Sequence, residues 1–274
     1  MDEINNLVLS GGAVNGFYTL GVLDVLSRMG KLNNLKSITG VSIGAFIGVL
    51  MSLGLSARDI ADRISEISSK GPNWGYAHLI TLLPMYLRTG FLMDSKLYEE
   101  YLDDLLKEYD INTMEDMYNK TNKDVTIVVS NLTDFKVEYI NYTDYPDMLV
   151  KDALLMSMCL PFCFEPRIFK KKTYCDGALF DSFPLQLHPC ENTLGVYLLD
   201  QESPIMFKQI MVGIMRQSYN KTKLLCKDHK VIEIYKTVPD IFMQANIQEQ
   251  LSMYTSGQNQ STKQIIELFG EVKE

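Results

Sequence analysis

The chain has 274 residues, of which 46% are hydrophobic and 22% are charged. This composition is typical of a globular protein, and the length is sufficient for one large domain with a buried core. The formal net charge is −8, and the sequence contains no long basic run. Both features argue against nucleic-acid binding, so no nucleic acid is expected among the partners.

The cysteines and the chain start constrain the cellular setting. Five cysteines, an odd number without CxxC spacing, favour free thiols over a disulfide framework or structural zinc. The first six residues are polar and acidic, so no secretory signal is expected. No segment offers the ~20 apolar residues that a transmembrane helix needs. We therefore expect an intracellular protein that is soluble or peripherally associated with a membrane.

Strands and helices alternate at the start of the chain. The expected elements are a strand at 6–10, a helix at 17–29, a strand at 35–39 and a helix at 43–53. A βαβα order is typical of a parallel sheet covered by helices.

Further elements follow in the rest of the chain. Residues 76–93 are rich in Leu, Met and aromatic residues, which fits either a core helix or a lid or membrane-touching edge. We expect a single domain over 1–274, with a catalytic core at about 5–200 and a helical or covering region at 201–274. The other expected elements are helices at 56–69, 95–109, 113 onward, 148–158, 204–219 and 260–269, and strands at 125–130, 135–142, 172–175, 193–199 and 231–238.

The junction between the second strand and its helix carries a Gly-x-Ser-x-Gly motif, Gly40 to Gly44, with Ser42 at its centre. A nucleophile elbow requires this strand–turn–helix context, because the serine must adopt a strained backbone conformation that exposes its hydroxyl. Gly40 and Gly44 lack a Cβ, so strand and helix can pack closely around the turn. The helix N-terminus would direct its partial positive charge toward a developing oxyanion.

A serine nucleophile also requires a base. The chain has three histidines, and a Ser-His-Asp triad in α/β-hydrolase order would use His188 or His229. His229 lies among charged residues, as a solvated side chain would. The alternative base is Asp176, in an Asp-Gly-Ala turn after a predicted strand. A carboxylate with an ordinary pKa of ~3.9 is a weak base unless burial raises that pKa.

The glycine-rich loop after the first strand is a candidate oxyanion site. Gly11, Gly12 and Ala13 are small, so their backbone N–H groups can converge on an anion. A phosphate-binding loop is the competing interpretation, but the spacing matches neither Gly-x-Gly-x-x-Gly nor the P-loop.

Taken together, these motifs resemble the patatin-like phospholipase family over roughly residues 5 to 200. The resemblance is carried by Ser10–Gly16, Gly40–Gly44, Asp176–Ala178, and the segment 153–166 with Ser157, Pro161, Phe164 and Pro166. It implies a three-layer α/β/α fold with a mostly parallel central sheet and a Ser–Asp dyad without histidine. Ser42 would be the nucleophile, Asp176 the proton acceptor, and Gly11, Gly12 and Ala13 the oxyanion hole.

Two positions depart from the family pattern. Ala13 stands where a third glycine is usual, which is a mild change if its φ is negative. Asn15 stands where a basic residue is usual, which removes a positive charge near the site and bears on headgroup preference or activity.

The resemblance implies a lipid acyl hydrolase of phospholipase A or lysophospholipase type, with no metal or organic cofactor. Its expected partner is a membrane phospholipid or another acyl lipid, with peripheral membrane contact. The alternatives are a Ser-His-Asp esterase and a non-enzymatic lipid-binding or interaction module on the same fold.

Overall fold

The computed structural model describes residues 3–70, 95–199, 206–236 and 245–270. Within these residues the chain forms a central sheet with the strand order β5-β6-β3-β2-β1-β7-β8, and β4 pairs with β3 beside this path. The predicted segment 76–93 lies outside the described residues. The strands are β1 Asn6–Leu9, β2 Ser37–Val41, β3 Asp124–Asn131, β4 Lys136–Ile140, β5 Arg167–Phe169, β6 Lys172–Asp176, β7 Thr193–Leu199 and β8 Lys230–Tyr235.

The sheet is parallel in its centre and antiparallel at one side. β1 pairs in parallel with β2 and β7, β2 with β3, and β7 with β8. β4 and β6 both run antiparallel to β3, and β5 runs antiparallel to β6. The mostly parallel α/β architecture expected from the sequence is thus confirmed.

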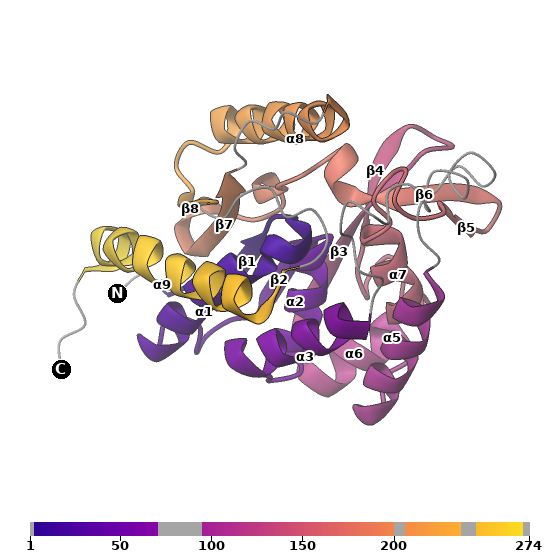
Figure 1. Cartoon of the computed structure of the whole chain (residues 1–274), viewed down its shortest axis with the longest axis horizontal. Coiled ribbons are helices and arrows are strands. Elements are labelled where there is room, and N and C mark those ends of the chain that lie inside the picture. The colour runs from indigo at the N-terminus through magenta and orange to yellow at the C-terminus, as the bar shows by residue number, and fades with distance from the viewer. Residues whose placement is uncertain (1–2, 71–94, 200–205, 237–244, 271–274) are drawn as a thin grey trace.

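Helices cover both faces of this sheet. In Figure 1, α8 lies above the sheet, whereas α1, α2, α3 and α9 lie below it. The described α-helices are α1 Gly16–Arg28, α2 Ile43–Ser52, α3 Ala57–Lys70, α5 Lys96–Glu108, α6 Met114–Thr121, α7 Val150–Ser157, α8 Met206–Leu225 and α9 Ile247–Phe269.

The burial of the central strands explains their continuous apolar sequences. Leu7 and Leu9 of β1 join the large core shared with α1 and α2, whereas Val8 faces a smaller core that contains Tyr197 of β7 and Tyr219 of α8. A strand that is buried on both faces needs apolar residues at successive positions, not at alternate ones.

The C-terminal part departs most from the sequence-based expectations. The terminal helix begins at Ile247, not at residue 260, because an Asn246–Glu249 capping box starts it thirteen residues earlier, in a stretch with few apolar side chains. Helix α8 continues to Leu225, past the expected end at 219. The three-residue strand β5 was not anticipated. β8 extends the sheet by pairing with β7, beyond the expected core boundary at 200.

Two other expectations concern the whole chain. All five cysteines are free, as expected, and four of them are buried. In the ranges that the structure describes, no helix has both the length and the apolar character needed to cross a membrane.

Candidate active site

One edge of β3 brings the two halves of the candidate site together. β2 pairs with the first part of this edge and ends with Val41 opposite Val128. β6 approaches along the same edge from the other direction and ends with Asp176 opposite Val129. Because Val128 and Val129 are consecutive, the residue after Val41 must lie next to Asp176. The topology therefore places Ser42 beside Asp176 although 134 positions separate them.

Ser42 occupies the strained turn that the motif predicts. Its φ is +55° and its ψ is −123°, and it forms the N-cap of α2. Positive φ is unfavourable for a residue with a Cβ, and such outliers concentrate at functional sites. A Cβ on Gly44 would lie 2.6 Å from the carbonyl oxygens of Leu9 and Ser10, so glycine permits the close approach of α2 to the loop after β1.

A short hydrogen bond links the serine to the carboxylate. The Ser42 hydroxyl donates to Asp176 Oδ2 over 2.6 Å, and the Ala178 N–H donates to Asp176 Oδ1 over 2.9 Å. Asp176 is 2% exposed. Burial raises the pKa of Asp176 to about 6, against the lowering effect of its two hydrogen bonds. The carboxylate is therefore a stronger base than an aspartate in water, yet it is ionised at neutral pH.

Ser157 of α7 holds the Ser42 turn in place through hydrogen bonds. Its hydroxyl accepts a hydrogen bond from the Ser42 N–H at 2.9 Å and donates to the Val128 carbonyl at 2.7 Å. The hydroxyl therefore ties the elbow to the strand that aligns both halves of the site. A Cβ on Gly177 would collide with the same Val128 carbonyl oxygen, so only glycine fits after Asp176. The sequence resemblance includes Ser157, but the hydrogen-bond partners of this residue depend on packing between α7, β2 and β3.

The loop of Gly11, Gly12 and Ala13 lies at the same site. All three residues line the cavity that also contains Ser42 and Asp176. Asn15 donates to the Gly12 carbonyl through its backbone N–H at 3.0 Å and through its side chain at 2.9 Å. In a trans peptide the C=O and N–H point in opposite directions, so the Ala13 N–H points away from Asn15. Asn15 thus fixes the orientation of the peptide between Gly12 and Ala13.

Ala13 does not have the negative φ that would make its replacement of a glycine mild. Its φ is +49°, in the left-handed region where glycine is favoured. An alanine there costs about 1 kcal/mol relative to the right-handed conformation. The change from glycine is therefore a source of local strain in the candidate oxyanion loop.

The candidate site opens into an apolar cavity of about 190 Å³. Its walls come from helices on both sides of the sheet, including Val212 and Met215 of α8, so the C-terminal region contributes directly to the site. A few polar or charged groups, among them Arg167 and Lys236, also line it. The apolar wall residues include Phe46, Ile64, Leu102, Leu155, Met158 and Phe164.

Neither His188 nor His229 reaches the elbow. The His188 Nε2 lies 2.8 Å from the Thr39 hydroxyl, and the His229 Nε2 lies 2.9 Å from the His188 carbonyl oxygen. Neither side chain lines the cavity. The expectation that His229 is solvated is wrong, because the residue is half-buried and its Nδ1 is enclosed without a described partner. These contacts disfavour the triad that would use either histidine.

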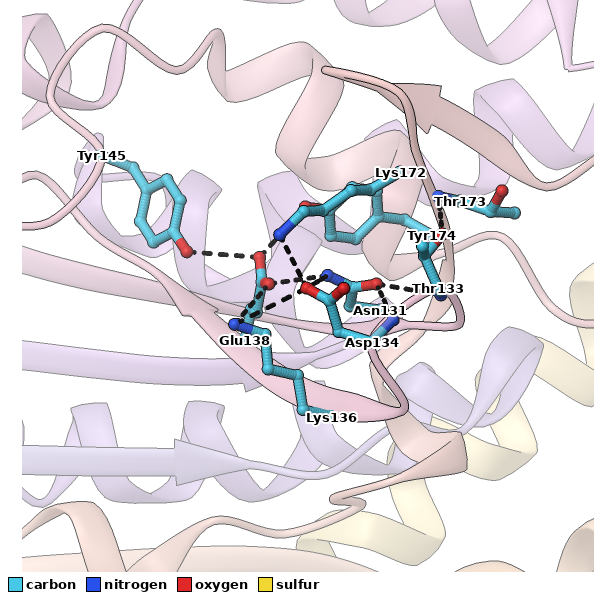
Figure 2. A network of polar contacts seen from close by, with 9 residues as sticks. All are labelled: Asn131, Thr133, Asp134, Lys136, Glu138, Tyr145, Lys172, Thr173 and Tyr174. Atoms are coloured by element: carbon cyan, nitrogen blue, oxygen red, sulfur yellow. Dashed lines mark hydrogen bonds and ion pairs between the residues drawn. The ribbon is translucent and has the colours of Figure 1, made fainter.

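A second buried carboxylate lies close to the site on the other side of β3. Glu138 of β4 is 7% exposed and accepts hydrogen bonds from Asn131, Tyr145 and Tyr174. Lys136 approaches one of its oxygens to 3.1 Å. Burial alone would raise the pKa of Glu138, but Asn131, Lys136 and Tyr174 together bring the pKa below its ordinary value. Figure 2 shows the donors converging on this carboxylate.

Comparison with known proteins assigns the family. A family model described as patatin-like phospholipase matches residues 7–187. The chain belongs to this family. It is 28% identical over 190 residues to the probable lipid hydrolase 463L of Invertebrate iridescent virus 6, with 66% of this chain and 62% of that protein aligned. It is 27% identical over 207 residues to triacylglycerol lipase 4 of Saccharomyces cerevisiae, with 65% of this chain and 22% of that protein aligned.

The fold agrees with this assignment. The structure resembles that of VipD from Legionella pneumophila with a TM-score of 0.61 and 17% sequence identity, over 97% of this chain and 67% of VipD. The structural match covers almost the whole of this chain. In the sequence comparison, this chain spans less than two thirds of the length of the viral relative.

Proposed function

We propose that this patatin-family chain is a lipid acyl hydrolase of phospholipase A or lysophospholipase type, in which Ser42 is the nucleophile and Asp176 the base. The single observation that carries the proposal is the 2.6 Å hydrogen bond from the Ser42 hydroxyl to a buried carboxylate at an apolar cavity. A nucleophile within hydrogen-bond reach of its base is the arrangement that covalent catalysis requires. Membership of this family and the names of the two relatives support the lipid substrate.

In the proposed mechanism, Ser42 attacks the ester carbonyl while its proton passes to Asp176. The N–H groups of Gly11, Gly12 and Ala13 stabilise the oxyanion of the tetrahedral intermediate. When this intermediate collapses, Asp176 returns the proton to the leaving alcohol and an acyl-serine remains. Water then attacks the acyl-serine with Asp176 again acting as base, which regenerates both residues.

The raised pKa of Asp176 fits this role. An acid–base group works best when its pKa is near the working pH, and a pKa of about 6 is nearer to neutrality than that of an ordinary aspartate. The apolar walls of the cavity would hold the acyl chain through the hydrophobic effect, without directional contacts.

The proposal is tested by labelling with a fluorophosphonate followed by peptide mapping. The unmodified protein is expected to be labelled at Ser42, Asp176→Asn only slowly, and Ser42→Ala not at all. Ser52→Ala is the control, because Ser52 lies on the same helix and bonds the Val49 carbonyl within it. Labelling of Ser42→Ala at the same rate, or equal labelling of Asp176→Asn, would contradict the dyad.

Acyl release from three substrates then defines the class. Diacyl phospholipid, monoacyl phospholipid and triacylglycerol are compared in detergent micelles, with Ser42→Ala as the blank. Release from the first two supports the proposed type, whereas release from triacylglycerol alone would replace it with a lipase. Absence of release from all three by a protein that fluorophosphonate labels would contradict lipid acyl hydrolysis.

A further inference from the structure

Two hairpin turns lie side by side next to the candidate site. One joins β3 to β4 through residues 132–135, and the other joins β5 to β6 through Lys170 and Lys171. The Leu132 N–H donates to the Thr173 carbonyl at 2.8 Å, and the Thr173 N–H donates to the Thr133 hydroxyl at 2.9 Å. These bonds make the two turns one continuous surface.

An ion pair and side-chain hydrogen bonds hold the two turns together. Lys172 bonds Asp134 at 2.6 Å, which connects the second hairpin to the first. Asn131 donates to both Asp134 and Glu138, so the turn is also connected to the buried carboxylate of β4. Figure 2 shows these side chains as one network. These bonds therefore fix the two turns relative to each other.

Apolar and basic side chains are exposed on these hairpins, beside the exposed Asp134. Phe135 is 80% exposed and Ile168 is 78% exposed, and among the described large hydrophobic residues only Ile247, at 81%, is more exposed. Lys170 and Lys171 form the tip beside Ile168. We call Phe135, Lys136, Ile168, Lys170 and Lys171 the hairpin surface.

The backbone of the hairpin surface is unfavourable for its residues. The φ angles of Phe135, Lys170 and Lys171 are +52°, +46° and +67°. Two successive positive φ angles define a type I′ hairpin turn, for which Asn-Gly is the preferred sequence. Fold stability would therefore favour small turn residues, and it gives no reason for two lysines and a projecting phenylalanine.

The local charge is opposite to that of the whole chain. Lys136 and Lys172 pair with the two carboxylates Asp134 and Glu138, and Lys170 and Lys171 add two further positive charges, in a protein with a net charge of −8. We propose that the hairpin surface docks the protein on an anionic phospholipid surface. Exposed apolar side chains enter the interface of such a surface while adjacent lysines meet its negative charge.

The hairpin surface is continuous with the candidate site. Arg167 of β5 lines the cavity, and β6 begins at the turn and ends at Asp176. Lys170 is three residues beyond Arg167, a distance of about 10 Å along an extended chain. Docking through these turns would therefore hold the cavity close to the lipid layer. This consequence for turnover rests on the proposed lipid hydrolase function, whereas the docking does not.

The test measures docking without turnover. All variants carry Ser42→Ala, and they are sedimented with vesicles of phosphatidylcholine alone or mixed with phosphatidylserine. Lys170→Glu with Lys171→Glu is expected to lower the affinity for the mixed vesicles at least tenfold, because each lysine near an anionic surface contributes severalfold. Phe135→Ser with Ile168→Ser is expected to lower it to a similar degree.

The matched controls are Ile247→Ser and Lys263→Glu, which change equally exposed side chains on α9. They are expected to bind as the Ser42→Ala parent does, and thermal unfolding checks that every variant is folded. Equal affinities in the hairpin and control variants, or no vesicle binding by the parent, would overturn the proposal. If the parent binds an acidic protein but no vesicle, the partner of the hairpin surface is that protein and not a lipid.

Hydrolysis separates the two proposals. With Ser42 intact, the hairpin variants should hydrolyse a short-chain soluble ester at the parental rate and vesicle lipid at least severalfold more slowly. If the unmodified protein cleaves neither substrate while its Ser42→Ala form binds mixed vesicles, the proposed function fails and the docking surface stands. Equal vesicle hydrolysis by hairpin and parent forms would contradict the docking proposal alone.

Discussion

Asp176 and Glu138 flank the same residue of β3 from opposite edges. Both are paired with Val129, one from β6 and the other from β4, and both are buried. Their surroundings nevertheless shift their pKa values in opposite directions. Asp176 accepts one hydroxyl and one backbone N–H, and burial raises its pKa to about 6. Glu138 meets an amide, two phenols and an ammonium group, and its pKa is lowered.

The difference lies in the number of donors. A carboxylate with a full set of donors is stabilised in its charged form and holds structure together, as Glu138 does for the two hairpins. A carboxylate with few donors keeps its proton affinity and can accept a proton from a neighbouring hydroxyl. The same burial therefore gives one anchor and one candidate base.

The largest expected effect concerns turnover. Asp176→Asn keeps the size of the side chain but removes the base, so kcat for ester hydrolysis is expected to fall by about three orders of magnitude or more. Glu138→Gln, the matched change on the other edge, is expected to leave kcat within about threefold. Steady-state kinetics on a soluble ester measures both. A comparable loss in the two variants would mean that the site depends on the network as a whole.

The pH dependence of kcat/KM should follow the ionisation of Asp176. Because the base must be ionised, kcat/KM is expected to rise about tenfold per pH unit below about pH 6 and to level off above it. The profile is measured between about pH 4.5 and about pH 8, with stability monitored in parallel. A flat profile down to about pH 5 would indicate a base with an ordinary carboxylate pKa.

Neutralising Asp176 and neutralising Glu138 should change the free energy of unfolding in opposite directions. The raised pKa of Asp176 means that its contribution to stability is present below about pH 4 and is lost as the pH rises through about 6. At pH 8, Asp176→Asn is therefore expected to raise the free energy of unfolding, by about 1–3 kcal/mol.

The contribution of Glu138 follows the reverse rule. Its lowered pKa makes its stabilisation present above the ordinary glutamate pKa of about 4.3 and lost as the pH falls through the lowered value. Glu138→Gln is expected to reduce the free energy of unfolding by about 2 kcal/mol at neutral pH, because charged hydrogen bonds are lost. Urea unfolding measures both variants, and two changes of the same sign would refute the contrast.

The smallest effect separates anchoring from catalysis. Tyr174 precedes Asp176 by two residues and donates to Glu138 at 3.1 Å. Tyr174→Phe removes this donor and is expected to cost about 1 kcal/mol of stability, with kcat unchanged. Urea unfolding and soluble-ester kinetics are both needed. A clear fall in kcat would show that the hairpin network positions Asp176.

Much of the fold could be predicted from local signals. The first strands are buried on both faces, so their apolar runs were distinctive, and α1 and α2 match the predicted helices to within one residue. Where an element is only partly buried, its apolar pattern in the sequence is weaker. The first half of α9 is rich in polar residues, and its start is set by a capping box that the periodicity did not reveal.

The sequence by itself determined the chemistry of the residues and their local geometry. Gly-x-Ser-x-Gly after an apolar strand requires an elbow, and the elbow has the expected positive φ at Ser42. The roles of Ser42, Asp176 and the loop of Gly11 to Ala13 stay predictions that labelling and kinetics must test.

The sequence motifs pointed to Asp176, but only the tertiary structure showed that its carboxylate contacts the serine and that its pKa is raised. Nothing local in an Asp-Gly-Ala turn specifies burial, and nothing local to Glu138 specifies its donors. Strand β3 settles both, because its register aligns β2 with β6 on one edge and β4 on the other. Desolvation and hydrogen bonding depend on neighbours distant in the chain, so they arise only when the sheet has formed.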